Sequence, residues 1–260
     1  HYHYVSRPPF TEAAAVRRAI YLAGQTDTPL YIAHMTCREA IAELQKAKGT
    51  GQRVSGETCT HYLTTTKEVL DNPDFNEAAK FVCSPALRDR EDCEALWQAL
   101  SDGLLTAVSS DHCGIDVAEL KQAGRNDFTQ IPNGSPGAGD RLHMVWTEGV
   151  CTGKLTRQKF VDVIATQPAK INGIYPRKGT LAVGSDADVV IFDPNYEGTV
   201  HLADNPNGVD YNLYEGRRQS GRVETGLLRA LGVVENDKFV GRAGQGKFIP
   251  ANMYASGYEN

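Results

Sequence analysis

The sequence predicts an α/β fold in which repeated strand and helix units form a parallel sheet, followed by a smaller β-rich region. Strand-like and helix-like patterns alternate through residues 1–172, which is typical of βα units. From Gly179 onward the pattern changes to short β-type runs separated by Gly, Asn and Asp. An apolar run at residues 104–108 ends abruptly in Asp111, as buried parallel strands that carry functional groups do. We therefore expect a second, β-rich region to begin near residue 175.

The first βα unit can be read directly from the spacing of apolar residues. Residues 11–23 predict an amphipathic helix with Val16 and Ile20 on its apolar face. Residues 30–33 form a short apolar run that closes on His34, which predicts a buried strand. The next helix is predicted to open with a capping box.

That capping box consists of Thr36 and Glu39, and the helix it opens is predicted to end at Gly49. Asp89 is predicted to cap a later helix through Leu96 and Leu100. Further strands of the parallel sheet are predicted at residues 53–56, 80–83 and 104–108. Together these elements predict a sheet with helices packed against it.

The remainder of the chain departs from this alternation. The segment between Cys113 and Asp140 is rich in Gly, Pro, Asn and Asp, and a loop of that length is more often a binding loop or lid than an inert insertion. Helices are predicted at residues 142–150, 156–164 and 166–171, and β-type runs at residues 180–184, 187–192, 223–228 and 238–240. The position of the loop beyond the Asp111 strand favours a functional role.

His34 and Asp111 are the strongest candidates for a functional site. Each follows an apolar strand, and imidazole and carboxylate are ligands of zinc and related divalent ions. A strand-end His can also be a hydrogen-bonded structural residue, and an Asp there can be a turn former or a helix cap. The occurrence of both groups at predicted strand ends favours a metal site.

The composition excludes several classes of function. The chain has 260 residues, of which 41% are hydrophobic, so it can bury a substantial core. Its net charge of −5 and the absence of a dense Lys/Arg block argue against binding to nucleic acid or to an anionic membrane. No apolar run reaches membrane-spanning length, and the six cysteines form no CxxC pair, which favours reduced thiols in a cytoplasmic enzyme. A small-molecule substrate is therefore expected.

Several motifs, in order along nearly the whole chain, resemble those of the dihydropyrimidinases and D-hydantoinases, which are cyclic amidohydrolases of the amidohydrolase superfamily. These motifs are Ser6-Arg7-Pro8-Pro9, Ile32-Ala33-His34-Met35, Gly56-Glu57-Thr58-Cys59, Cys83-Ser84-Pro85, Ser110-Asp111-His112-Cys113, Asp127-Phe128-Thr129-Gln130-Ile131-Pro132-Asn133-Gly134 and Tyr175-Pro176-Arg177-Lys178-Gly179. A further stretch, Val183 to Ile191, is similar to one found across many amidohydrolases. The Ile131-Pro132-Asn133-Gly134 loop is the more specific indicator of substrate class.

The resemblance implies a division of the chain into parts of two larger domains. Residues 1–172 would be the later part of a TIM-type (β/α)8 barrel. Residues 173–230 would be part of a small β-sandwich, and residues 231–260 a C-terminal strand and oligomerisation tail. A homo-oligomer, either a dimer or a tetramer, is implied as well.

The resemblance also implies a binuclear metal centre that hydrolyses a cyclic amide, either a dihydropyrimidine or a 5-substituted hydantoin, to an N-carbamoyl amino acid in pyrimidine catabolism. His34 matches a ligand of one divalent ion, and Asp111 matches the ligand of the other ion and the catalytic proton shuttle. Ser84 and Asn133 match positions that hold the amide edge of the substrate ring. Zinc is the expected metal.

Other parts of the family site would lie upstream of the matched region. They include two paired histidines, a carbamylated lysine, an oxyanion-stabilising tyrosine and another histidine ligand. His1 and His3 imitate the histidine pair, but they stand before the Ser6-Arg7-Pro8-Pro9 motif at a position that matches a loop after the fifth barrel strand. We therefore expect the chain to be an incomplete, inactive portion of the enzyme.

Two alternatives remain open at the level of sequence. An allantoinase or dihydroorotase would share the metal site, and His61 is similar to the residue usual in allantoinases. A non-catalytic, dihydropyrimidinase-like scaffold protein would share the fold. Such scaffolds typically lack the ligands that His34 and Asp111 supply here, which favours an enzyme.

Overall fold

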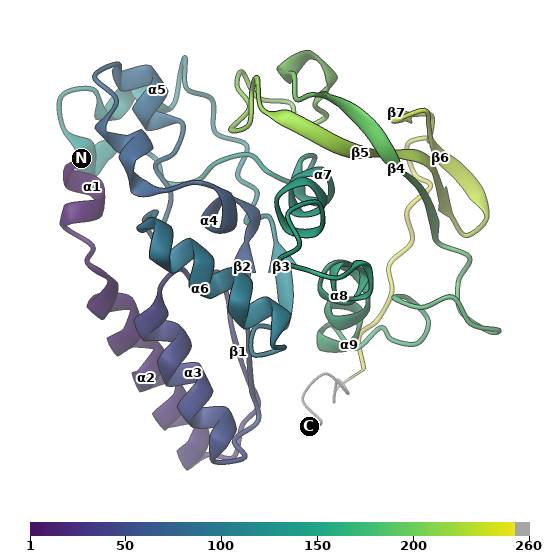
Figure 1. The fold of residues 1–260 in the computed structure, drawn as a ribbon, viewed down its shortest axis with the longest axis horizontal. Helices are drawn as coiled ribbons and strands as arrows, with labels where there is room; N and C mark the ends of the chain where they lie inside the picture. The colour runs from purple at the N-terminus through teal and green to yellow at the C-terminus, as the bar shows by residue number, and fades with distance from the viewer. Residues whose placement is uncertain (253–260) are drawn as a thin grey trace.

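The structure is a computed structural model that describes residues 1–252 of the chain. A parallel sheet lies at its centre in the order β1-β2-β3, formed by β1 (Leu30–Ile32), β2 (Val54–Cys59) and β3 (Ala107–Ser109) (Figure 1). Ile32 of β1 is paired with Gly56, and Ser109 of β3 with Cys59. All three strands therefore end at the same edge of the sheet.

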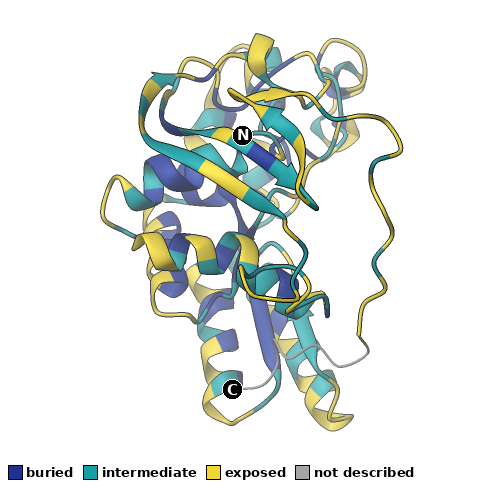
Figure 2. Ribbon diagram, turned by 90° about the vertical axis from the view of Figure 1, so that its right-hand side faces the viewer, coloured by how far each residue is buried: buried dark blue, intermediate teal, exposed yellow. Residues whose placement is uncertain are grey.

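Helices α2 (Pro9–Gln25), α3 (Arg38–Gly49) and α6 (Arg90–Ser101) supply much of the packing around this sheet. The approach is close at Gly56, where a Cβ atom would lie 2.7 Å from Sδ of Met35 and 3.3 Å from a methyl carbon of Leu44. The buried core combines apolar residues of these helices with those of β2 and β3, and buried residues gather where the helices meet the sheet (Figure 2).

Shorter helices surround this layer. They are α1 (Tyr2–Val5), α4 (Thr60–Thr64), η1 (Lys67–Asp71), α5 (Phe75–Ala79), η2 (Lys121–Gly124), η3 (Phe128–Gln130), α7 (Arg141–Val145), η4 (Trp146–Val150), α8 (Arg157–Val161), η5 (Asp162–Thr166), α9 (Gln167–Ile171) and η6 (Leu202–Asp204). Within residues 1–252, no helix combines the length and apolar character needed to cross a membrane.

A second sheet is antiparallel and consists of β4 (Val189–Thr199), β5 (Arg218–Leu228), β6 (Leu231–Glu235) and β7 (Lys238–Phe239). It lies beyond α7 in Figure 1, and contacts from β5 to α7 and η4 join it to the rest of the chain. The amide of Ser220 donates to the hydroxyl of Thr147 at 2.9 Å, and Trp146 contacts Phe192 with ring centroids 4.8 Å apart. The β-rich region expected near residue 175 is therefore a single sheet from 189 to 239, and it continues past residue 230. The tail predicted within 231–260 lies partly outside the described residues.

Two predicted strands are wrong. Residues 80 and 81 form a turn and residues 82 and 83 have no regular structure, and the carbonyl of Val82 accepts hydrogen bonds from Lys121 and Gly134 instead of from a strand. Residues 180–184 also form a turn, closed by a hydrogen bond from the Ser185 amide to the carbonyl of Ala182. The strand predicted at 104–108 is present but displaced, because the amide of Leu105 bonds to the carbonyl of Ala99 at the end of α6.

Both predicted helix caps also differ from the structure. The N-cap of α3 is Cys37, whereas the Thr36 amide and hydroxyl donate to the Glu12 carboxylate on α2. Asp89 is the N-cap of α6, but its carboxylate forms an ion pair with Lys67 at 2.7 Å and makes no capping hydrogen bond. In both cases a long-range partner has replaced the local one.

Candidate functional site

His34 and Asp111 lie two residues beyond the ends of β1 and β3, at the same edge of the parallel sheet. Their φ angles are +40° and +44°, which place both residues in the left-handed region. Non-glycine residues rarely adopt that conformation, and such strain concentrates at functional sites. His34 is half-buried and Asp111 is exposed, so neither side chain is enclosed in the core.

The turn that carries His34 is attached to β2 through the next residue, Met35, which uses both of its backbone groups. The amide of Met35 donates to the carbonyl of Glu57 at 2.8 Å, and its carbonyl accepts from the hydroxyl of Thr58 at 2.8 Å. These bonds fix the point at which the chain leaves β1. A shift in β2 would therefore displace His34 as well.

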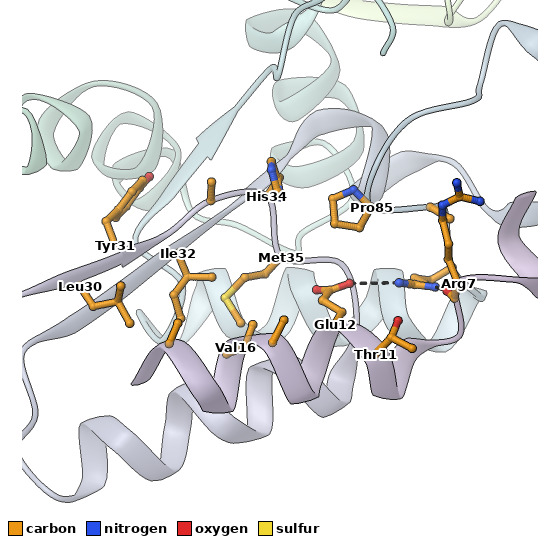
Figure 3. Close-up of a pocket in the computed structure, with 15 residues that line it drawn as sticks. Arg7, Thr11, Glu12, Val16, Leu30, Tyr31, Ile32, His34, Met35 and Pro85 are labelled. Carbon is orange, nitrogen blue, oxygen red and sulfur yellow. Dashed lines mark hydrogen bonds and ion pairs between the residues drawn. The ribbon is translucent and has the colours of Figure 1, made fainter. Parts of the chain in front are cut away.

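A cavity of about 460 Å³ lies between α2 and β1, and His34 is among its lining residues (Figure 3). Pro85, which follows Ser84 in the chain, lines the same cavity. Most of the other lining side chains are apolar, and Val16 and Ile32 are examples. His34 and Pro85 therefore line one cavity, although Ser84 itself is not among the lining residues.

Ser84 and Asn133 lie on two segments that are hydrogen-bonded to each other. The amide of Gly134 donates to the carbonyl of Val82 at 2.9 Å, and both Ser84 and Asn133 are exposed. The side-chain amide of Asn133 donates to the carbonyl of Ile131 at 3.2 Å, so it stabilises its own loop. The backbone of this loop remains the more suitable part for holding a ligand.

The same loop is attached to the segment that carries Asp111. The amide of Cys113 donates to the carbonyl of Ser135 at 3.0 Å, and the amide of Gly137 donates to Nδ1 of His112 at 3.3 Å. His112 thus has a structural partner in the loop. Hydrogen bonds join the segments of Asp111, Ser84 and Asn133, whereas none of these three residues lines the cavity beside His34.

Cys59 is the last residue of the central strand β2, and His61 lies just beyond it in α4. Burial raises the pKa of the Cys59 thiol well above its ordinary value, and Sγ lies 3.2 Å from Oγ of Ser109. His61 is only 4% exposed, and its Nε2 has no hydrogen-bond partner. Burial, followed by the charge of His34, lowers the pKa of His61 to about 3. Both side chains are therefore uncharged near neutral pH.

Replacing His61 with Gln is expected to make the chain less sensitive to acid. The pKa of His61 is about 3 in the fold and about 6.5 in an unfolded chain, so unfolding takes up a proton between these values. The stabilisation is present above pH 6.5 and is lost as the pH falls toward 3, with a slope of up to about 1.4 kcal/mol per pH unit. Urea unfolding of the metal-free chain at several pH values would measure this slope.

The exposed His201, whose side chain is 55% accessible, provides the control through His201→Gln. That variant should keep the wild-type pH dependence, whereas His61→Gln should show a shallower one. Equal slopes in all three proteins would contradict the burial argument.

Two polar residues near the site were missed by the sequence reasoning. Glu57 on β2 accepts hydrogen bonds from the hydroxyl of Tyr31 at 2.6 Å and from that of Ser109 at 2.8 Å, and it links all three strands. Lys121 is fully buried beneath the Asn133 loop. A charged residue at the end of a predicted strand, as at Glu57, is a sequence signal of a functional or structural role. The sequence around Lys121, by contrast, does not distinguish it from a surface lysine.

His1 and His3 have separate partners and do not form a ligand pair. Nδ1 of His1 lies 2.8 Å from a carboxylate oxygen of Asp71 on the surface. His3 is buried, its Nε2 lies 2.8 Å from the carbonyl oxygen of Cys83, and burial lowers its pKa. Among residues 1–252, no three His, Cys, Asp or Glu side chains are grouped closely enough to hold a metal ion.

Comparison with known proteins places this arrangement in a family. The sequence model of the Amidohydrolase family matches residues 26–238. A D-hydantoinase from Ralstonia pickettii is 46% identical over 253 residues, which are 97% of this chain and 55% of that protein. A dihydropyrimidinase from Arabidopsis thaliana is 39% identical over 247 residues, which are 95% of this chain and 46% of that protein.

A comparison with solved structures indicates the same family. The crystal structure of a dihydropyrimidinase from Brevibacillus agri NCHU1002 superposes with a TM-score of 0.96 at 43% identity, over 98% of this chain and 55% of that one. The chain thus spans about half the length of the proteins it matches. Because the family model covers most of its residues, the chain belongs to the Amidohydrolase family.

Proposed function

We propose that this chain supplies the later part of a TIM-type barrel and part of a β-sandwich to an enzyme that hydrolyses cyclic amides. The proposal keeps the division into residues 1–172, 173–230 and 231–260. The observation that carries it is the placement of His34 and Asp111 at one edge of the parallel sheet. The substrate would be a dihydropyrimidine or a 5-substituted hydantoin, and the product an N-carbamoyl amino acid.

His34 and Asp111 fit a divalent metal centre as part of a larger ligand set. Imidazole and carboxylate suit zinc, but a catalytic zinc usually has three protein ligands. The described residues supply no group of three, so the remaining ligands, including a carbamylated lysine, would have to come from a further segment. When bound, two such ions would lower the pKa of a water molecule and polarise the scissile carbonyl.

The chain's own residues have distinct tasks in the proposed reaction. The carboxylate of Asp111 would accept the proton of the attacking water and then return it to the departing ring nitrogen. The hydroxyl of Ser84 and the backbone of the Asn133 loop would bind the alternating C=O and N–H groups of the ring. Because these segments are hydrogen-bonded to each other, the ring would be held in a fixed position relative to Asp111.

His61 was the residue that favoured an allantoinase or a dihydroorotase-like enzyme. It is buried against Tyr62, with ring centroids 4.1 Å apart, so its identity does not have to reflect contact with a substrate. This supports the dihydropyrimidinase and hydantoinase assignment. The retained His34 and Asp111 argue against a non-catalytic scaffold. A cytoplasmic homo-oligomer remains a prediction.

The function can be tested by completing the chain with a relative's sequence. The isolated chain, purified with zinc, is expected not to open the rings of dihydrouracil or hydantoin, because it has too few metal ligands. Joining it to the unmatched N-terminal part of the Ralstonia pickettii D-hydantoinase should yield both zinc binding and turnover.

The measurements are the zinc content per chain and the rate of N-carbamoyl product formation. The N-terminal part expressed alone is the control for residual activity of the relative. Ring opening by the isolated chain with stoichiometric metal would refute the proposal that it is incomplete. A folded, zinc-loaded chimera without turnover would refute the cyclic amidohydrolase assignment.

A further inference from the structure

We propose that Lys121 is a positioning residue that joins the two substrate-binding segments and thereby sets the affinity for the ring. This inference rests on the proposed function, because it assigns Ser84 and the Asn133 loop to binding. Lys121 lies in η2, in the long segment between the Asp111 strand and the Asn133 loop. It has no part in the proton transfers described above.

The ammonium group of Lys121 contacts one segment on each side. Nζ donates to the carbonyl of Gly134 at 2.8 Å and to the carbonyl of Val82 at 3.2 Å. Gly134 directly follows Asn133, and Val82 stands two residues before Ser84. One side chain therefore holds both candidate binding segments through their backbones.

The attachment is buried and has no compensating carboxylate. Lys121 is 0% exposed, and none of the ion pairs found within residues 1–252 includes it. The titratable groups that face it include the thiols of Cys83 and Cys113 and the ring of His3. Burial lowers its pKa to about 8, so the ammonium form still predominates at neutral pH. Burying such a cation costs desolvation free energy, and the hydrogen bonds that this charged donor makes to the two carbonyls are correspondingly strong.

Other contacts show that the geometry of the loop is tightly determined. Gly134 has a φ angle of +135°, and a Cβ atom there would lie 2.5 Å from Cβ of Cys113. The hydroxyl of Ser135 donates to the carbonyl of Lys80 at 2.7 Å. Lys121 joins the two segments from their buried side, because its ammonium group donates to the backbone carbonyls of both Val82 and Gly134. Loss of its donors would free the loop on the side that faces Ser84.

The first experiment measures how strongly the backbone amides of the Asn133 loop are protected from hydrogen exchange in the isolated chain. Amide hydrogen exchange of Gly134 and Gly137, whose amides donate to Val82 and His112, is expected to be slow in the wild type and at least about 10-fold faster in Lys121→Met, which removes the ammonium donors and the charge. Lys154→Met is the control, because Lys154 pairs with Glu94 at the surface. Fast exchange of Gly134 in the wild type would overturn the proposal without any variant.

The second experiment measures substrate affinity in the chimera with the Ralstonia pickettii segment. Lys121→Met is expected to raise KM for dihydrouracil about 10-fold, with kcat within about threefold of wild type and zinc content unchanged. A parallel fall in kcat and zinc content would show a general structural role and overturn the positioning role. If Lys121→Met does not fold, Lys121→Gln, which retains a single donor group, should show a smaller rise in KM, and an unchanged KM would overturn the proposal.

The two proposals fail in different ways. A chimera that binds zinc but shows no turnover would remove the proposed function, yet the exchange experiment would still report whether Lys121 holds the loop. An active chimera whose KM does not respond to Lys121 would leave the proposed function in place and remove only the positioning role.

Discussion

Replacing Asp111 with Asn in the completed enzyme is expected to lower kcat at least about 100-fold, because general acid–base groups contribute about 10²–10⁴ to rate. Asn is nearly isosteric, so the left-handed conformation of this residue, at φ +44°, can be retained. The substitution removes the proton acceptor and the negative charge, and it also changes a proposed metal ligand, so the zinc content per chain is measured alongside the rate. The rate of N-carbamoyl product formation under saturating substrate measures the effect.

Asp102→Asn is the matched control, since Asp102 is exposed at the end of α6 and its carboxylate accepts a hydrogen bond from Gln98 at 2.8 Å. That variant should keep kcat within about twofold of wild type. If Asp111→Asn were to keep a kcat within threefold of wild type with zinc still bound, Asp111 could not be the proton shuttle.

The largest expected effect on stability comes from Arg88. Its guanidinium lies 3.2 Å from the Glu12 carboxylate, and the two side chains are only 5% and 9% exposed. Arg88 also donates to the hydroxyl of Thr36 at 2.9 Å, so it joins α2 to the turn before α3. Arg88→Met would leave the Glu12 charge buried without its cation, at a cost of about 3–5 kcal/mol in the free energy of unfolding.

Chemical unfolding of the isolated chain measures this loss, and a double variant provides the control. Glu12→Gln combined with Arg88→Met removes the unpaired charge and should recover part of the stability lost in Arg88→Met. Arg17→Met should change stability by less than about 1 kcal/mol, because that residue forms only a surface pair with Glu43. A loss below about 1 kcal/mol for Arg88→Met would contradict the importance of the buried pair.

The elements that the sequence predicted correctly are those decided by local pattern. The helix predicted over residues 11–23 is present as α2, and the strands that lead to His34 and Asp111 are present as β1 and β3. Amphipathic spacing and short apolar runs are properties of neighbouring residues, so they can be read without knowing the rest of the fold. The same holds for the order of motifs that indicated the family.

The errors arose where a polar group had a better partner far away in the sequence. Thr36 was expected to cap its own helix, but its hydroxyl donates to Glu12, which stands 24 residues earlier. Residues 80–83 have the apolar composition of a strand, yet the carbonyl of Val82 is occupied by Lys121 and Gly134. A local pattern cannot show such competition, because the competing donors are brought close only by folding.

The sequence by itself therefore determined the α/β class, the family and the identities of His34, Asp111, Ser84 and Asn133 as candidates. Only the tertiary structure decided that the segments of Asp111, Ser84 and Asn133 are joined by hydrogen bonds, and that Lys121 is buried between two of them. The physical reason is that residue type and spacing specify secondary structure and chemistry, whereas burial and long-range hydrogen bonds depend on which backbone groups the packed elements leave unpaired.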